Sequence, residues 1–355
     1  MRVLLVEPEG DGKYIPLGLA KLSTYYKEKG ADVEYVKGLK NLPEEKFDKV
    51  FISSLFTWNV PQVIEIARVC RSYISDDVIV GGIAATMLAN EIESSVDVKV
   101  VRGCMPEIDN CRPDYSLFPD IDYSIGYTTR GCPRRCAFCG VWKIEPKYYE
   151  ISDWTNWIDV RKPRIIILDN NILATSDKHF KDVVKKLVRY GKAVDFNTGI
   201  DCRLLTEDKA KMLSLLDIPT VRLAFDTMKS DGHIQRAIEL TKKYITRDVT
   251  VYCLYNHNDD PSDFWYRLNK LNECRVNIYP MKFIDYTIDG RNYIGEKWTK
   301  QLLKGFDRIM STFRDGMIGA GCNRKRFELM FGRGGGEFVE KLEGSIDGQM
   351  GFDMF

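Results

Sequence analysis

The sequence has no long apolar run, no excess of either charge and no segment typical of a signal peptide. Its apolar stretches stay below the ~18 residues that a membrane-spanning helix needs. The first residues turn acidic after a few apolar positions, which predicts a strand. With 52 Lys and Arg against 51 Asp and Glu, the net charge is +1, so nothing in the composition favours a membrane surface or a nucleic acid. We expect a cytoplasmic protein without membrane contact, and nucleic acid is a disfavoured but open partner.

A second closely spaced cysteine pair is also missing, although the chain has ten cysteines. Three of them form the group discussed below. Disulfides are not expected in a long chain without an export signal, and isolated cysteines most often serve as small buried apolar residues. This is the prediction for Cys70, Cys104, Cys111, Cys202, Cys253, Cys274 and Cys322.

The first part of the chain alternates short apolar strands with helical patterns, which predicts an α/β fold with a doubly wound parallel sheet. A linker with three prolines, residues 104–124, follows and places a domain boundary near residue 115. The strands are expected at 2–7, 32–36, 48–54, 77–82 and 98–103, and the helices at 17–30, 60–74 and 84–91.

The second part alternates in the same way and predicts six strands with helices between them. Six units are too few for an eight-stranded barrel, so residues 116–290 are expected to form a partial (β/α)6 barrel. Residues 291–355 are expected to add a short C-terminal helical extension and a flexible tail. The six strands are expected at 123–130, 163–170, 193–199, 220–226, 249–256 and 276–283.

Polar residues collect where these strands end, and such a barrel places its chemistry at the C-terminal strand ends. The competing interpretation is that loops are polar in any protein. Among the histidines, His179 and His233 are expected on helix surfaces, whereas His257 follows a strand. The strand-end residues are Asp169, Asn170, Asn171, Asn197, Asp201, Arg203, Asp226, Asn256, His257 and Asn258.

Cys132, Cys136 and Cys139 stand at CxxxCxxC spacing directly after the first strand of the second part. Three thiolates are one short of the usual set of four for a structural zinc or an iron–sulfur cluster. Either a fourth ligand from elsewhere completes a zinc site, or the missing ligand leaves one metal position open for a substrate or cofactor.

With Phe138 before the last cysteine, "CPRRCAFC" resembles the cluster motif of the radical S-adenosylmethionine (SAM) superfamily. The resemblance covers residues 120–285. It implies that the three cysteines bind three irons of a 4Fe-4S cluster and that SAM chelates the fourth. Reductive cleavage of SAM then yields a 5'-deoxyadenosyl radical. It further implies a flavodoxin- or ferredoxin-like reductant.

The same resemblance suggests SAM contacts at two strand ends. Where the family commonly has a GGE-like segment, this chain has Asp169, Asn170 and Asn171. In "GIDCRLL", Asp201 or Arg203 would meet the ribose or the carboxylate of SAM, although an arginine there can equally pair with a neighbouring acid.

The front sheet resembles the cobalamin-binding domain that precedes the radical domain in one class of this superfamily. The matching segment "VGGIAAT" makes Gly81, Gly82 and Thr86 the candidate contacts, since glycines at strand ends permit close approach to a flat ligand. Ala85 stands where that class often has histidine, and no DxHxxG motif is present. The alternative is a domain that has lost the cofactor.

These features predict an enzyme that cleaves SAM for radical modification of an unidentified substrate, with methyl transfer to carbon as the leading reaction if cobalamin binds. The alternatives are a zinc-stabilised binding module and an iron–sulfur redox sensor. A basic run at 323–326 with Arg333 could contact phosphates, but such runs are usually solvated surface. The glycines at 334–336 lack the pattern of a phosphate loop.

Overall fold

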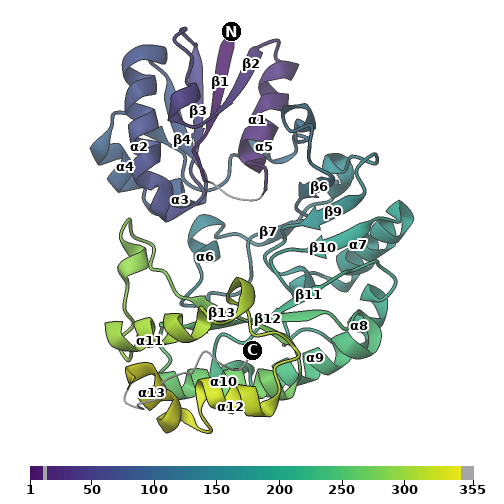
Figure 1. Ribbon diagram of the computed structural model, residues 1–355. Coiled ribbons are helices and arrows are strands. Elements are labelled where there is room, and N and C mark those ends of the chain that lie inside the picture. Colours follow the sequence, from purple (N-terminus) through teal and green to yellow (C-terminus); the bar gives the residue numbers. More distant parts are fainter. Residues whose placement is uncertain (11–13, 345–355) are drawn as a thin grey trace. The chain divides into compact units, whose positions relative to one another are not determined.

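The computed structural model describes residues 1–10 and 14–344 and confirms the α/β class with parallel sheets. By its internal contacts the chain divides into two units, Met1–His179 with Ile284–Asn292 and Phe180–Phe283 with Tyr293–Phe355 (Figure 1). The domain boundaries expected near residues 115 and 290 stay predictions. The expected flexible tail concerns residues 345–355, which lie outside the described residues.

The first unit begins with a five-stranded parallel sheet in the order β2-β1-β3-β4-β5. Helices cover both of its faces, α1 and α5 on one and α2, α3 and α4 on the other (Figure 1). The strands are β1 (Arg2–Glu7), β2 (Asp32–Lys37), β3 (Lys49–Ser53), β4 (Val78–Gly81) and β5 (Lys99–Val100). The helices are α1 (Leu17–Glu28), α2 (Val60–Val69), α3 (Ile83–Met87), α4 (Ala89–Ser95) and α5 (Pro106–Asp109).

Strand β1 is apolar at its four inner positions, residues 3–6. Val3 and Leu5 belong to the core under α1, whereas Leu4 and Val6 belong to the core under α2. A parallel strand covered on both faces buries both sets of alternating side chains, so it reads as a continuous apolar run.

The rest of the first unit holds the cysteine segment. β6 (Tyr123–Gly126) pairs in parallel with β9 (Arg164–Ile167), and β7 (Thr129–Arg130) pairs antiparallel with β8 (Tyr149–Glu150). The predicted single strand 123–130 is therefore interrupted after Gly126, where the indole of Trp157 packs so closely that a Cβ would lie 2.3 Å from it. The short helix α6 (Val141–Ile144) follows the cysteines, and α7 (Asp177–Tyr190) follows β9.

The second unit contains a parallel sheet in the order β11-β12-β13, and several of its helices begin at side-chain caps. Thr206 accepts a hydrogen bond from the backbone of Lys209 at the start of α8, and Asp260 caps α10 in the same way. All six strands predicted for the second part exist, and their closure into a barrel stays a prediction. The elements are β10 (Ala193–Phe196), α8 (Glu207–Leu213), β11 (Val221–Ala224), α9 (His233–Tyr244), β12 (Val249–Tyr255), α10 (Pro261–Glu273) and β13 (Asn277–Lys282).

Three further helices follow: α11 (Lys300–Met310), α12 (Arg324–Phe331) and α13 (Gly335–Glu343). Buried aromatic rings pack α11 and α13 against α10, and α12 against α13. Two glycines permit this packing. A Cβ on Gly305 would lie 1.9 Å from the carbonyl oxygen of Leu342, and one on Gly335 would lie 2.6 Å from the side chain of Ser262. The glycine-rich stretch thus brings helices close together.

The basic run lies on α12, where two of its arginines have partners on the protein. Arg324 pairs with Glu328 at 2.5 Å, and the Arg326 guanidinium lies 5.2 Å from the centroid of the Phe313 ring. These contacts support the interpretation of the run as structural surface. No helix within residues 1–10 and 14–344 is long and apolar enough to cross a membrane.

Candidate functional site

The three cysteines lie on the loop Gly131–Gly140, between β7 and α6, which we call the cluster loop. Gly131 starts it with a φ of +71°, and a Cβ there would lie 2.3 Å from the carbonyl oxygen of Lys147. Only glycine fits this combination of positive φ and close backbone approach. Within the loop, the backbone N–H of Cys139 donates to the carbonyl of Cys136 at 3.0 Å, which turns the second and third cysteines around one bend.

The three cysteines carry half-buried thiols that take part in no disulfide. Burial raises the pKa of the Cys132 thiol, and a hydrogen bond with the Asn171 side chain acts in the opposite direction. The structure therefore places Asn171, a residue predicted from the end of β9, beside the first cysteine.

The donor set fits an iron–sulfur cluster in its chemistry, since three thiolates on one loop are the ligands such clusters use. The loop does not gather them in advance. Within residues 1–10 and 14–344, no three His, Cys, Asp or Glu side chains lie close enough together to hold a metal ion. Binding of a cluster would have to draw the three sulfur atoms together, which a glycine-flanked loop permits.

Glu145 fastens the start of the cluster loop. Its carboxylate accepts a hydrogen bond from the backbone of Gly131 at 2.6 Å, pairs with Arg130 at 3.1 Å and accepts from the side-chain amide of Asn170 at 3.3 Å. Asn170, another predicted residue, thus lies near the loop. Glu145 itself was not predicted, because no fixed spacing marks a residue that returns to the loop from the far side of α6.

Asp169 is buried, with 1% of its surface exposed, and it holds the strand that leads to the loop. Its carboxylate accepts hydrogen bonds from the backbone of Thr128 at 2.6 Å and of Thr129 at 2.9 Å, and from the Thr128 hydroxyl. Burial raises the pKa of Asp169 to about 6, against the effect of these bonds. The proposed SAM contact at this residue remains untested, but in this structure its oxygens bind the protein's own backbone.

His179 corrects a prediction, because it is buried and not on the surface. Its Nε2 lies 3.3 Å from the Thr128 hydroxyl oxygen and its Nδ1 lies 3.8 Å from a carboxylate oxygen of Glu150. The first turn of α7 follows β9 closely, so this residue faces the end of the sheet. His233 is exposed, as expected.

The three residues predicted to contact cobalamin lie at or just after the carboxyl end of β4. Gly82 and Thr86 make structural contacts there, and the space beside Gly81 is open. Gly82 has a φ of +119°, and a Cβ there would lie 2.5 Å from the carbonyl oxygen of Ser54. The Thr86 hydroxyl donates to the carbonyl of Gly82 at 2.9 Å and accepts from the backbone of Gly103 at 2.9 Å. At Gly81 the nearest atom is a side-chain carbon of Val101, 3.9 Å from a Cβ.

The same end of the front sheet lies against the helix that follows the cluster loop. α3 contacts α6, and a Cβ on Gly103 would lie 3.1 Å from the carbonyl oxygen of Ile144. The first unit therefore brings the carboxyl edge of the front sheet and the cysteine segment into contact. Sequence spacing could not show this, since the linker between them has no clear period.

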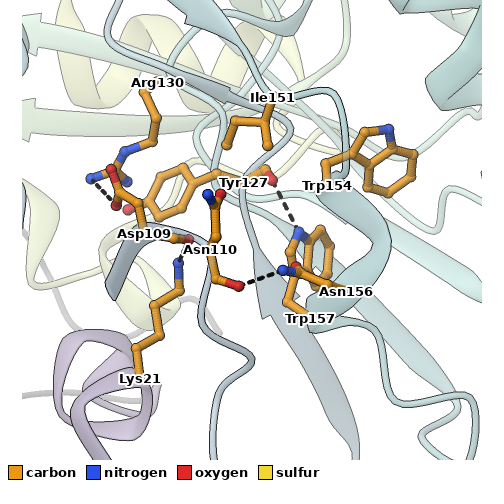
Figure 2. A pocket seen from close by; sticks show the side chains of 9 residues that line it. All are labelled: Lys21, Asp109, Asn110, Tyr127, Arg130, Ile151, Trp154, Asn156 and Trp157. Carbon is orange, nitrogen blue, oxygen red and sulfur yellow. Dashed lines mark hydrogen bonds and ion pairs between the residues drawn. The ribbon is translucent and has the colours of Figure 1, made fainter. Parts of the chain in front are cut away.

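A small hollow lies beside the start of the cluster loop, and Figure 2 shows the side chains around it. Arg130 pairs with Asp109 at 3.8 Å and stacks 4.2 Å from the centroid of the Tyr127 ring. Trp157 donates to the carbonyl of Tyr127 at 3.0 Å, and Lys21 donates to the carbonyl of Asp109 at 2.5 Å. These contacts join the linker to β7, so the side chains around the hollow hold the start of the cluster loop in place.

In the second unit, Asp201 and Arg203 pair with each other through two bonds of 2.8 and 3.2 Å. This is the pairing that the sequence left open as the alternative to SAM contact.

At the ends of β11 and β12, the fully buried guanidinium of Arg267 bridges several groups. It donates to the carbonyls of Phe225 and Leu254 at 2.8 and 2.7 Å and pairs with Asp259 at 2.5 Å. Burial raises the pKa of Asp226 to about 6, and the nearby Arg267 acts against this. Arg267 organises these strand ends and was missed from sequence, because a lone arginine in a helical pattern reads as surface.

The remaining strand-end residues of β12 are held by the chain itself. Asn256 has a φ of +66° and is fully buried, and its side chain accepts from Gly295 at 2.8 Å and donates to the carbonyl of Tyr293 at 3.0 Å. His257 lies with its ring centroid 4.5 Å from that of Phe283, and burial lowers its pKa.

Sequence comparison identifies no relatives: no protein-family model matches the chain, and no curated protein matches it. Solved structures do match it. TsrM from Kitasatospora setae, a radical SAM methyltransferase solved with cobalamin and a [4Fe-4S] cluster bound, has a TM-score of 0.64 at 13% identity over 81% of this chain and 77% of that chain. TsrM with a tryptophan substrate and the SAM analogue aza-SAM has a TM-score of 0.58 at 14% identity, over 81% and 75% of the two chains.

OxsB, a cobalamin-dependent SAM radical enzyme solved with aqua-cobalamin, has a TM-score of 0.56 at 15% identity. The match covers 76% of this chain and 52% of OxsB. At these identities the likeness is one of fold. The chain shares its α/β fold with these radical SAM enzymes.

Proposed function

We propose that the chain is a radical SAM enzyme that binds a 4Fe-4S cluster through Cys132, Cys136 and Cys139. The observation that carries the proposal is the placement of a CxxxCxxC loop after β6 and β7 in a chain whose fold matches TsrM at a TM-score of 0.64. The motif and the fold are two independent lines of support, because the structural match rests on the course of the backbone and the two sequences are only 13% identical.

The bound cluster would supply an electron to SAM held at its open iron position, and so the radical chemistry of the superfamily. This chain's residues provide the surroundings. Asn171 lies beside Cys132, and Asp169 fixes the two threonines that precede the loop. We propose that Asp201 or Arg203, which pair with each other in this structure, contacts the ribose or the carboxylate of SAM.

For the reaction, we propose cobalamin-dependent methyl transfer to a carbon of an unidentified substrate. The sheet order β2-β1-β3-β4-β5 supports this, because parallel sheets of this kind bind ligands at their carboxyl edge. At that edge the hydroxyl of Ser54 is fully buried and has no hydrogen-bond partner among the described residues. Buried hydroxyls are normally bonded, so an orphan here is a group that a bound ligand or water would satisfy.

The enzyme proposal is tested by anaerobic reconstitution with iron and sulfide, followed by reduction in the presence of SAM carrying a labelled methyl group. We expect iron and sulfide in a ratio near one, and either 5'-deoxyadenosine or labelled methyl on cobalamin. A flavodoxin- or ferredoxin-like protein is the proposed reductant and should replace dithionite.

The outcomes separate the alternatives. Zinc without iron would indicate a zinc-stabilised module, and a redox-active cluster indifferent to SAM would indicate a sensor. For cobalamin, the protein is expressed with hydroxocobalamin in the medium. A purified protein without a corrinoid spectrum would contradict methyl transfer by this route while leaving SAM cleavage open.

A further inference from the structure

The segment Ile284–Asn292 leaves the second unit after β13 and belongs by its contacts to the first unit. We call this segment the strap. It is a compact turn: the backbone N–H of Gly290 donates to the carbonyl of Thr287 at 3.1 Å, and a Cβ on Gly290 would lie 2.0 Å from the carbonyl oxygen of Asp285. A turn this tight holds the side chains of the strap in a fixed arrangement.

At one end the strap contacts the cluster loop. The Tyr286 hydroxyl donates to the carbonyl of Phe138 at 2.5 Å. The ring of Tyr286 covers Gly140, with two ring carbons 3.4 Å from the position that a Cβ would take there. The Lys143 ammonium lies 5.3 Å from the centroid of the same ring.

At the other end the strap contacts the front sheet. Ile288 packs against the core formed under α2, and the Arg291 guanidinium lies 4.4 Å from the centroid of the Trp58 ring. Trp58 in turn stacks on Phe56, with the ring centroids 4.6 Å apart, in the segment that follows β3. The strap thus joins the edge of the front sheet to the last residues of the cluster loop.

The bond to Phe138 bears on Cys139 because one peptide group links the two residues. Its carbonyl is held by Tyr286, and its N–H donates to Cys136 at 3.0 Å. With both polar atoms of this peptide held, its plane is held, and with it the position of the Cys139 Cα, so the Cys139 side chain can move only by rotation beyond this peptide. The orientation of peptide dipoles and the solvent exposure near the sulfur atoms are among the properties that set cluster potentials.

We propose that Tyr286 is a positioning residue that fixes the third cysteine of the cluster loop and that the strap ties this loop to the front sheet. The role of the loop as a cluster site rests on the proposed function. The tether itself is a property of the chain without a cluster, so the two can fail separately.

The test compares Tyr286→Phe, which removes one oxygen and keeps the ring, with Tyr73→Phe, a matched loss of a hydroxyl from a side chain that is 69% exposed. In the full-length, cluster-free protein, hydrogen exchange is followed in peptides covering residues 136–144. Loss of one hydrogen bond predicts exchange about fivefold faster in these peptides for Tyr286→Phe. For Tyr73→Phe we expect the wild-type rate. Arg291→Ala, which leaves Tyr286 in place, should accelerate the same peptides by a smaller factor.

The reconstituted proteins give the second readout. Tyr286→Phe should lose iron to a chelator about fivefold faster and shift the reduction potential of the cluster, at unchanged melting temperature. Equal exchange of residues 136–144 in Tyr286→Phe and wild type would overturn the tether. Faster exchange in Tyr286→Phe, together with a wild-type protein that binds no iron on reconstitution, would support the tether and contradict the cluster. Unchanged exchange in Arg291→Ala would overturn the link to the front sheet.

Discussion

Replacing Asp169 by asparagine is expected to stabilise the cluster-free protein at neutral pH. The carboxylate is 1% exposed, and burial raises its pKa from 3.8 to about 6 although three donors point at it. The folded state therefore binds this proton more tightly than the unfolded state does. The stability that protonation adds is complete below pH 3.8 and is lost as the pH rises through 6.

The pKa values set the magnitude. A rise from 3.8 to about 6 corresponds to about 3 kcal/mol, because each pKa step is worth about 1.36 kcal/mol. An asparagine resembles the neutral acid. Its oxygen can keep the bonds from the backbone of Thr128 and Thr129, and its amide can donate to the Thr128 hydroxyl, which can turn to His179 at 3.3 Å. We expect Asp169→Asn to gain up to about 3 kcal/mol at pH 7.

The assay is urea unfolding of the cluster-free protein followed by tryptophan fluorescence between pH 4 and 8. The difference in unfolding free energy between Asp169→Asn and wild type should grow as the pH rises. Asp169→Ala leaves two buried N–H groups without an acceptor and should be about 2–6 kcal/mol less stable than Asp169→Asn at pH 7. Asp153→Asn, at an exposed position, is the control for the change in charge. A loss of stability at pH 7 in Asp169→Asn would show that the ionised carboxylate is favourable and would refute the reasoning.

Three further changes have expected outcomes. Cys132→Ala should abolish the brown absorbance of the reconstituted cluster and all SAM cleavage, whereas Cys70→Ala, in the front core, should retain both. Arg267→Met should cost about 3–5 kcal/mol in urea unfolding, because the ion pair of Asp259 at 2.5 Å is lost; a loss below 1 kcal/mol would contradict this. Gly82→Ala should cost at least about 1–3 kcal/mol from its φ of +119° alone, measured as a lower unfolding midpoint, and wild-type stability would show that the turn can rearrange.

The regular elements could be predicted from sequence because local periodicity determines them. β1 has the predicted bounds, and each of the six strands predicted for the second part corresponds to strand structure, the first of them interrupted after Gly126. The apolar run of β1 is buried on both faces, and α10 starts at a capped aspartate followed by proline. The helices of the C-terminal extension are harder to predict from periodicity, because glycines within them are there for contacts with distant helices.

Contacts between distant segments could not be predicted in the same way. His179 is expected on a surface and is buried. No sequence pattern marks Tyr286, although its hydroxyl donates to Phe138 on the cluster loop, 148 residues away. The family resemblance makes Asp201 and Arg203 candidate SAM contacts, but whether they face a ligand or each other depends on their rotamers, and in this structure they pair.

The sequence by itself determined the donor set, because the spacing of Cys132, Cys136 and Cys139 and the glycines around them are local properties of one loop. It also determined the alternation of strands and helices. Only the tertiary structure decided what surrounds the loop: the carboxylates of Asp169 and Glu145, and the strap that joins it to the front sheet. These partners are chosen by chain reversal and packing over long separations, and no local pattern encodes such contacts.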